Sequence, residues 1–131
     1  MKLPSGLEIL EDVEGSGLAT ASGDTVVYNV RIFLNRGDEV PINDVQRDRG
    51  IPDTRIRHED GQVFVDHIST LGKRQAIAGI EKALTGMRAG GFRKLRVSPH
   101  LAYRDRGVPG LIPPDAVLTV SVWLREIRRQ A

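Results

Sequence analysis

The chain has 131 residues, of which 40% are hydrophobic and 27% charged, ordinary proportions for one globular domain with a net charge of +2. Cysteine is absent, which excludes disulfides, thiolate metal sites and cysteine nucleophiles. Apolar runs stay shorter than the roughly 18 residues of a membrane-spanning helix, and residues 1–6 lack the apolar stretch of a secretory signal. We therefore expect a cytoplasmic protein with no membrane contact.

The first expected elements are two strands. Residues 7–13 carry a weak alternating pattern, and residues 24–33 carry the strongest one near the N-terminus, with glycine-rich breaks before it. One face of the second strand is apolar, as in an antiparallel sheet that covers a core with one side. The residues of that face are Val26, Tyr28, Val30 and Ile32.

The middle of the chain is less regular. Between residues 47 and 61, charges of both signs alternate with single apolar residues and no period emerges. We expect a charged surface loop there, which could also serve as a binding element. A weaker strand pattern follows at residues 62–68.

One amphipathic helix is expected after these strands. Four apolar residues stand at positions i, i+3, i+7 and i+10, which makes a single stripe on a helix of about three turns. They are Ile77, Ile80, Leu84 and Met87. Gly86 marks the expected C-terminal end.

Two strands complete the pattern. Residues 92–98 alternate weakly, and residues 116–127 alternate clearly between apolar and polar side chains. Trp123 falls on the polar face of the last strand, so we expect its ring to point away from the core. A sheet of this kind needs a cover for its apolar face, and the one helix can provide it. The fold class is therefore predicted as α+β.

Two segments resemble the FKBP-type peptidyl-prolyl cis-trans isomerases. Residues 71–90, LGKRQAIAGIEKALTGMRAG, match the family's Leu-Gly pair, its turn into the helix and its Gly-Met pair. Residues 97–122, VSPHLAYRDRGVPGLIPPDAVLTVSV, match its Ala-Tyr pair, glycine-containing loop and Ile-Pro-Pro sequence. The resemblance covers nearly the whole chain, interrupted by extra residues around 41–66. It implies a single FKBP-like domain, residues 1–131, with a charged loop insertion near 41–61 and a curved antiparallel sheet of about five strands around one short helix.

The resemblance also implies an activity and a set of site residues. Such a protein accelerates rotation about X-Pro bonds of peptides or unfolded proteins, and it needs neither cofactor nor metal. Tyr103 would offer its hydroxyl to the substrate carbonyl. The backbone N–H of Ile77 would bind the peptide with Ala76 beside it, and Ile112 would close one wall of the pocket.

Several pocket positions depart from the family's pattern. Aliphatic residues stand where the family usually places aromatic rings, and Pro41 stands where it places an acid. The aliphatic residues are Ile80, Val120, Val30 and Val40. Tyr28 lies two residues before Val30 on the same face, and a local bulge could bring it into the pocket. Because rings contribute area and edge contacts to a bound proline, we expect weak isomerase activity and at most weak binding of a macrolide ligand.

Two other functions stay open. An FKBP-like fold could keep a shallow proline-recognising groove without useful catalysis, or it could act as a chaperone-like or dimer-forming module through residues 47–61. Fold resemblance alone cannot choose among them, since function resides in the site.

Other charged and polar groups favour simpler interpretations. Six basic residues between positions 88 and 106 face only Asp105, but no aromatic residues are interleaved with them to stack bases, so we expect a solvated strand face and no nucleic-acid partner. The three histidines lack metal-ligand spacing, and exposed loop positions are the expectation for His58 and His100.

Overall fold

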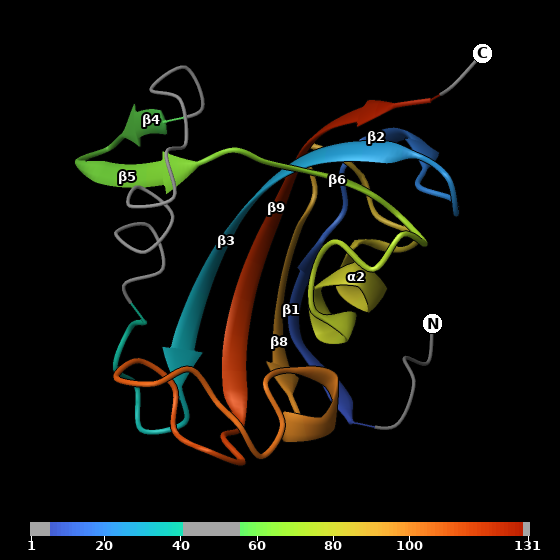
Figure 1. Ribbon diagram of the computed structural model, residues 1–131. Helices are drawn as coiled ribbons and strands as arrows, with labels where there is room; N and C mark the ends of the chain where they lie inside the picture. The colour runs from blue at the N-terminus through green and yellow to red at the C-terminus, as the bar shows by residue number, and fades with distance from the viewer. Residues whose placement is uncertain (1–5, 41–55, 130–131) are drawn as a thin grey trace.

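The computed structural model describes residues 6–40 and 56–129, except for the side chains of residues 56–59, 62 and 63. Its main feature is one curved antiparallel sheet of five strands in the order β1-β8-β9-β3-β6, which confirms the predicted α+β architecture (Figure 1). The strands are β1 (Leu7–Val13), β3 (Thr25–Leu34), β6 (His67–Thr70), β8 (Phe92–Val97) and β9 (Leu118–Arg128).

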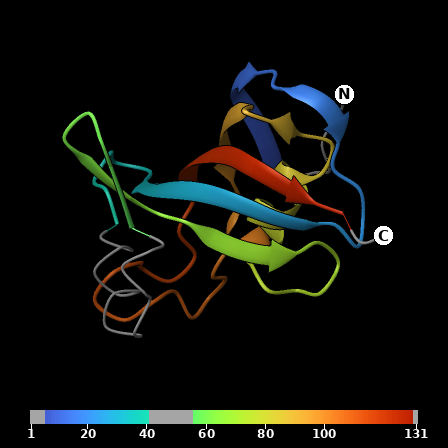
Figure 2. The same ribbon diagram turned by 90° about the horizontal axis from the view of Figure 1, so that it is seen from above.

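The helix α2 (Ala78–Leu84) lies against the concave face of this sheet (Figures 1 and 2). It is shorter than predicted. Ile77 is its N-cap in an extended conformation, and the chain leaves the helix at Thr85, where ψ is 125°. Gly86 then takes a φ of 83°, which L side chains disfavour. Met87 is buried in the core from the following turn and is not part of the helix.

A glycine lets the helix approach the sheet closely. A Cβ on Gly79 would lie 2.5 Å from Cγ1 of Val97 on β8 and 3.0 Å from the Leu101 carbonyl oxygen. Leu101 ends the short 3-10 helix η2 (Pro99–Leu101), which follows β8. Gly79 therefore sets the distance between α2 and the elements that lead into the Ala-Tyr pair.

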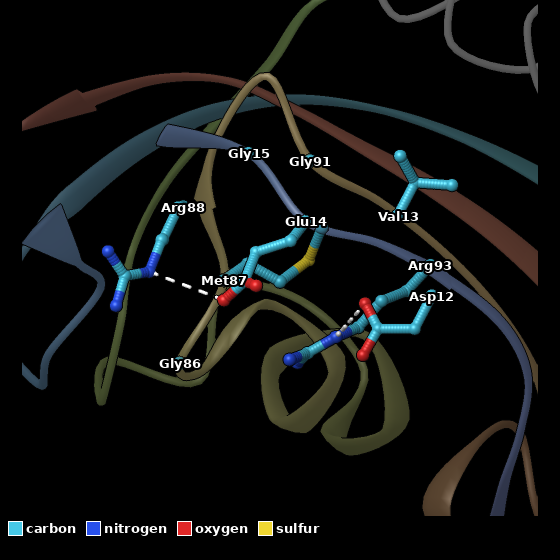
Figure 3. A pocket seen from close by; sticks show the side chains of 9 residues that line it. All are labelled: Asp12, Val13, Glu14, Gly15, Gly86, Met87, Arg88, Gly91 and Arg93. Atoms are coloured by element: carbon cyan, nitrogen blue, oxygen red, sulfur yellow. Dashed lines mark hydrogen bonds and ion pairs between the residues drawn. The ribbon is translucent and has the colours of Figure 1, made fainter. Parts of the chain in front are cut away.

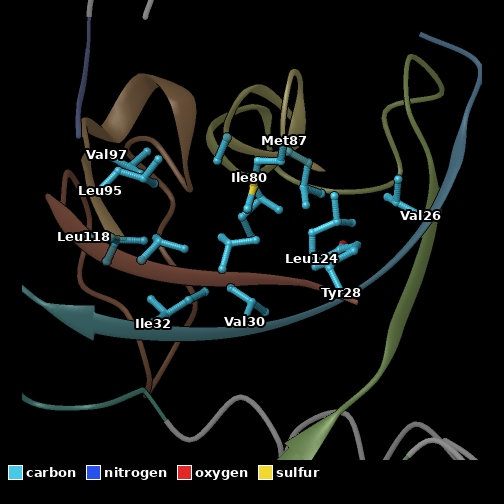
Figure 4. Close-up of a cluster of buried hydrophobic side chains, with 14 of the residues drawn as sticks. Val26, Tyr28, Val30, Ile32, Ile80, Met87, Leu95, Val97, Leu118 and Leu124 are labelled. Atoms are coloured by element: carbon cyan, nitrogen blue, oxygen red, sulfur yellow. The ribbon is translucent and has the colours of Figure 1, made fainter. Parts of the chain in front are cut away.

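The core fills the space between α2 and the concave face of the sheet (Figure 4). The alternating faces predicted for β3 and β9 are confirmed, because every second residue of each strand belongs to this core. These residues are Val26, Tyr28, Val30 and Ile32 of β3, and Leu118, Val120, Val122 and Leu124 of β9.

Two small sheets flank the main one, and of their four strands the sequence pattern had indicated only β5 (Gln62–Val65), as part of the strand expected at 62–68. β2 (Ser16–Ala19) pairs with β7 (Arg88–Ala89), although the segment around residue 16 was expected to be only a glycine-rich break. β4 (Ile56–Glu59) pairs with β5, so part of the expected loop at 47–61 is a hairpin. Residues 41–55, which hold most of the predicted insertion, lie outside the described residues.

The single strand predicted at residues 62–68 is in fact two strands, β5 and β6, in different sheets. Asn29 of β3, which is fully buried, explains the break. Its side-chain amide donates to the Val65 carbonyl at 2.9 Å and to Asp66 Oδ1 at 2.7 Å. These bonds hold the chain at the bend, and β6 begins directly after it at His67.

The basic residues at positions 88–106 do not form one patch. Arg93 points inward and is 6% exposed, and its guanidinium donates to the Ala83 and Thr85 carbonyls at the C-terminal end of α2. Arg88 instead pairs with Glu14, in the link between β1 and β2, and Arg96 pairs with Glu8 of β1. The structure thus disperses these charges. In residues 6–40 and 56–129, no helix is long and apolar enough to cross a membrane.

Candidate functional site

The nine residues expected to form the site all belong to the hydrophobic core or pack against it. Six of them are buried members of the core, and three are half-buried and pack against it. The buried ones are Tyr28, Val30, Val40, Ile80, Ile112 and Val120, and the half-buried ones are Ala76, Ile77 and Tyr103. We call the six buried residues the wall of the candidate site and the three half-buried residues its rim. Ala76 and Ile77 lie just before α2, and Tyr103 lies just after η2.

The Ile77 backbone has the conformation that its expected role requires. Its carbonyl oxygen accepts hydrogen bonds from the Ile80 and Glu81 N–H groups and so starts the helix. Its own N–H precedes the helix and donates to no group in the described part of the chain. An N–H at a helix start is a donor without an intrahelical partner, and a peptide carbonyl can supply the missing acceptor.

The loop after η2 positions Tyr103 and Ile112. The Tyr103 carbonyl accepts from the Gly107 N–H at 3.0 Å, and Val108 and Ile112 exchange two backbone hydrogen bonds of 2.8 Å. Gly107 has a φ of 60°, and a Cβ there would meet the Ile112 carbonyl oxygen at 2.2 Å. The loop is therefore a tight hairpin that requires glycine at this point, and its geometry turns Ile112 into the core.

Tyr28 lies beside the site in a polar setting that the sequence did not reveal. Its hydroxyl and the Ser69 hydroxyl are 3.2 Å apart, and its ring stacks on His67 with centroids separated by 5.3 Å. Burial raises the pKa of the Tyr28 hydroxyl above 10.0; the Ser69 hydrogen bond opposes this rise, and the charges of Glu81 and Tyr103 add to it.

A bulge was expected to bring Tyr28 into the pocket. The pairing of β3 with β9 is irregular at this point, because Val27 is opposite Glu126 while Tyr28 is opposite Leu124. The extra residue, Arg125, is on β9, so β3 itself keeps its alternation and carries both Tyr28 and Val30 on the inner face.

Val40 lies at the far end of the cluster. Its N–H donates to the Ile32 carbonyl at 2.8 Å, and its side chain is 4% exposed. Its burial is compatible with the expected wall position, which stays a prediction. Pro41, the expected replacement for an acid, lies outside the described residues.

A cavity of about 300 Å3 lies apart from this cluster, where β1 and β2 meet the C-terminal end of α2 (Figure 3). Two ion pairs border it: Arg93 with Asp12 at 3.3 Å and Arg88 with Glu14 at 3.5 Å. None of the nine expected residues lines it. Since each carboxylate already has a guanidinium partner, this cavity presents balanced charge and no separate reactive group.

The described histidines lie apart from any metal-binding group. Within the described residues no group of three or more His, Asp or Glu side chains could hold a metal ion. His100 is exposed, as expected, and His67 stacks on Tyr28. The side chain of His58, in β4, lies outside the described residues.

Comparison with known proteins identifies the family. Residues 18–125 match the family model described as FKBP-type peptidyl-prolyl cis-trans isomerase. FK506-binding protein 1A of Neurospora crassa is 35% identical over 124 residues, which cover 94% of this chain and 89% of that protein.

Two further relatives match about half of the chain. FK506-binding protein 2 of Candida glabrata is 44% identical over 78 residues, 54% of this chain and 57% of that protein. Peptidyl-prolyl cis-trans isomerase FKBP9 of Bos taurus is 45% identical over 75 residues, 52% of this chain and 13% of that much longer protein. The model match and the nearly full-length relative agree with the fold and the Ala-Tyr and Ile-Pro-Pro segments. The chain belongs to the FKBP-type peptidyl-prolyl cis-trans isomerase family.

Proposed function

We propose that this chain accelerates cis/trans rotation about X-Pro bonds in peptides or unfolded proteins, and that it does so weakly. The observation that carries the proposal is the arrangement of Tyr103 and the Ile77 N–H at the half-buried rim of one apolar cluster. Tyr103 carries a hydroxyl and Ile77 a backbone N–H donor, and both residues pack against the apolar core.

This arrangement suits the chemistry of amide rotation. The barrier of about 18–20 kcal/mol arises from partial double-bond character of the C–N bond, and the twisted amide has less charge separation than the planar one. An apolar surface favours the twisted form by removing water from the amide, while the two donors hold the peptide. The reaction needs no nucleophile, metal or cofactor.

The distribution of aromatic side chains supports weak activity. The chain has six aromatic residues, and only Tyr28 and Tyr103 belong to the core cluster or pack against it. Aliphatic residues occupy the other wall positions, and the six buried wall residues are at most 6% exposed. A proline would therefore meet a shallow surface with little ring area.

The same observation favours a second function. A shallow, mainly aliphatic surface can bind a proline segment without lowering the rotation barrier, as a binding or chaperone-like module would. Because relatives are named as FK506-binding proteins, we further propose weak binding of FK506 at this site. The expected compartment remains the cytoplasm, and the expected unit is one domain with a charged insertion near 41–61.

A proline-peptide isomerisation assay separates these functions. With wild-type protein the relaxation rate should rise above the uncatalysed rate, and Tyr103→Phe should lower kcat/KM about two- to tenfold, the effect of losing one hydrogen bond. Urea unfolding of the same variant shows whether the fold is intact. Equal relaxation rates with and without the protein would refute the enzyme and leave the binding module.

A second variant tests the assignment of the walls. Val40→Phe combined with Pro41→Asp restores the family's usual ring and acid, and it should raise kcat/KM or the affinity for FK506. No gain in either quantity would contradict the placement of Val40 in the wall.

A further inference from the structure

A groove continues from the candidate site along the loop that carries Ile112. It is a cavity of about 390 Å3, and Ile112 lies both in its lining and in the core cluster that forms the site. A neighbouring cavity of about 380 Å3 shares Leu34, Arg36 and Pro113 with it. We call the first cavity the Arg106 groove. A peptide bound against Ile112 therefore has a hollow beside it for a neighbouring residue.

The lining of the Arg106 groove is apolar except for two cations. Leu34, Leu111 and Pro113 contribute apolar surface, and the charged lining residues are both arginines, Arg36 and Arg106. The apolar surface can hold the stem of a side chain, and a guanidinium can bind a carboxylate at its tip.

The two arginines are available to different degrees. Arg36 pairs with Asp38 at 2.5 Å, but the side chains are 76% and 61% exposed, and such surface pairs are weak. Arg106 is exposed and forms no ion pair within residues 6–40 and 56–129. Asp115 lines the neighbouring cavity, and neither it nor Asp105, which directly precedes Arg106, forms an ion pair with Arg106. Arg106 is thus the stronger candidate for contact with an acidic side chain.

Other unpaired cations lie on the loops that carry the site. Arg104 directly follows Tyr103, and Lys73 and Arg74 precede Ala76 by three and two positions. All three are exposed and none forms an ion pair in the described part of the chain. Their field adds to that of Arg106 and favours an anionic partner on approach.

We propose that the Arg106 groove is a subsite for an acidic residue, Asp or Glu, next to the proline of the bound peptide. The proposal rests on the function proposed above, and it adds a substrate class: proline peptides with a neighbouring carboxylate. The apolar floor holds the methylene groups of that residue, and Arg106 binds its carboxylate.

Peptides with one variable position test the subsite. Glu, Gln or Lys is placed in turn at each of the two residues after the proline and at the second residue before it, and both kcat/KM and binding by fluorescence anisotropy are measured. At about 0.01 M ionic strength, where charges act over about 30 Å, the Glu peptide should exceed the Gln peptide about two- to fivefold at one position. At about 1 M the ratio should approach one.

Variants of Arg106 show whether this residue causes the preference for Glu over Gln. Arg106→Gln should bring the Glu-to-Gln ratio toward one, and Arg106→Glu should make Lys the preferred residue at the same position. Arg128→Gln is the matched control, since it removes an exposed arginine at the other end of β9, about 30 Å along the strand from the groove. It should leave the ratio unchanged.

The outcomes separate this proposal from the isomerase proposal. Turnover of all peptides at equal rates would overturn the acidic subsite and leave the isomerase intact, as would a Glu preference that survives Arg106→Gln. A Glu preference in binding without any turnover would support the subsite and refute the isomerase. Absence of both binding and turnover for every peptide would refute both proposals.

Discussion

The ring of Phe64 meets the ring of Trp123 edge-on, with centroids 5.2 Å apart, on the side of the sheet opposite the core. Phe64 comes from β5 and Trp123 from β9, and Phe92 of β8 lies 5.0 Å from the same indole. The guanidinium groups of Arg31 and Arg125 each lie 5.8 Å from the Phe64 ring centre. This contact attaches β5 to the outer face of the main sheet.

Phe64→Ala should therefore disturb the outer face and not the site. The side chain is 6% exposed, so its loss should lower the free energy of unfolding by about 2–3 kcal/mol, less than for an interior ring because the Arg31 and Arg125 stems can fill part of the space. Trp123 emission should shift to the red as water reaches the indole. Phe33→Ala, also half-buried on that face, is the control and should leave the emission unchanged.

Trp123 also reports which face binds a ligand. Because the indole lies on the outer face and the candidate site on the inner one, addition of a proline peptide or FK506 should hardly change its fluorescence. Binding itself would be followed separately by anisotropy of a labelled peptide. Strong quenching that tracks binding would place the ligand on the outer face.

Tyr28→Phe tests the buried hydroxyl pair with Ser69. Loss of this hydrogen bond should lower the free energy of unfolding by about 0.5–1.5 kcal/mol at pH 8. Burial raises the Tyr28 pKa above 10.0, so the stability from its neutral form is fully present below pH 10 and is lost as the pH rises toward the folded-state pKa. Between pH 8 and 11 the free energy of unfolding, measured with urea, should fall less steeply for the variant than for wild type. Equal slopes against pH for the two proteins would contradict this explanation.

Asp24→Asn tests a group that affects stability at acid pH. Arg129 donates to both carboxylate oxygens of Asp24, at 2.8 and 3.0 Å, and this hydrogen bonding holds the Asp24 pKa below 3.8. The resulting stability is present above pH 3.8 and is lost as the pH falls through the lower folded-state pKa. The free energies of unfolding of wild type and variant should therefore differ at pH 7 and become equal at acid pH. Asp38→Asn, in an exposed pair with Arg36, should change neither stability nor its pH dependence.

Gly79→Ala tests the contact between α2 and β8. In an open helix this change would add stability of about 1 kcal/mol, but here the new methyl would lie 2.5 Å from Val97 Cγ1. We expect the free energy of unfolding to fall by about 1–3 kcal/mol. Combined with Val97→Ala, the loss should be smaller than the sum of the two single losses, because the clash is removed. Full additivity would show that the contact is not the cause.

Parts of the fold and site followed from local patterns. The inner faces of β3 and β9 could be predicted because every second residue from Val26 to Ile32 and from Leu118 to Leu124 is apolar. Tyr103 and Ile77 were expected from the Ala-Tyr and helix-entry segments; both pack half-buried against the core, and their role in binding stays a prediction. The helix was predicted to be longer than it is, because Met87 continues the apolar spacing. In the structure the chain leaves the helix at Thr85, and Met87 is buried from the segment that follows.

Other parts depended on contacts between distant segments. His67 and Ser69 approach Tyr28 only because β6 pairs with β3, and strand register cannot be read from a weak alternating pattern. The outer aromatic cluster joins Phe64 and Trp123, which are far apart in the chain. Neither arrangement leaves a local signal.

The sequence by itself determined the fold class, the inner faces of the two long strands and the family motifs around Tyr103 and Ile112, because periodicity and turn residues act over short stretches of chain. Only the tertiary structure decided where the chain bends after Val65, which wall residues become buried, and where the aromatic rings lie. Those features depend on the Asn29 amide, on strand pairing and on close packing, each of which joins residues that are distant in sequence.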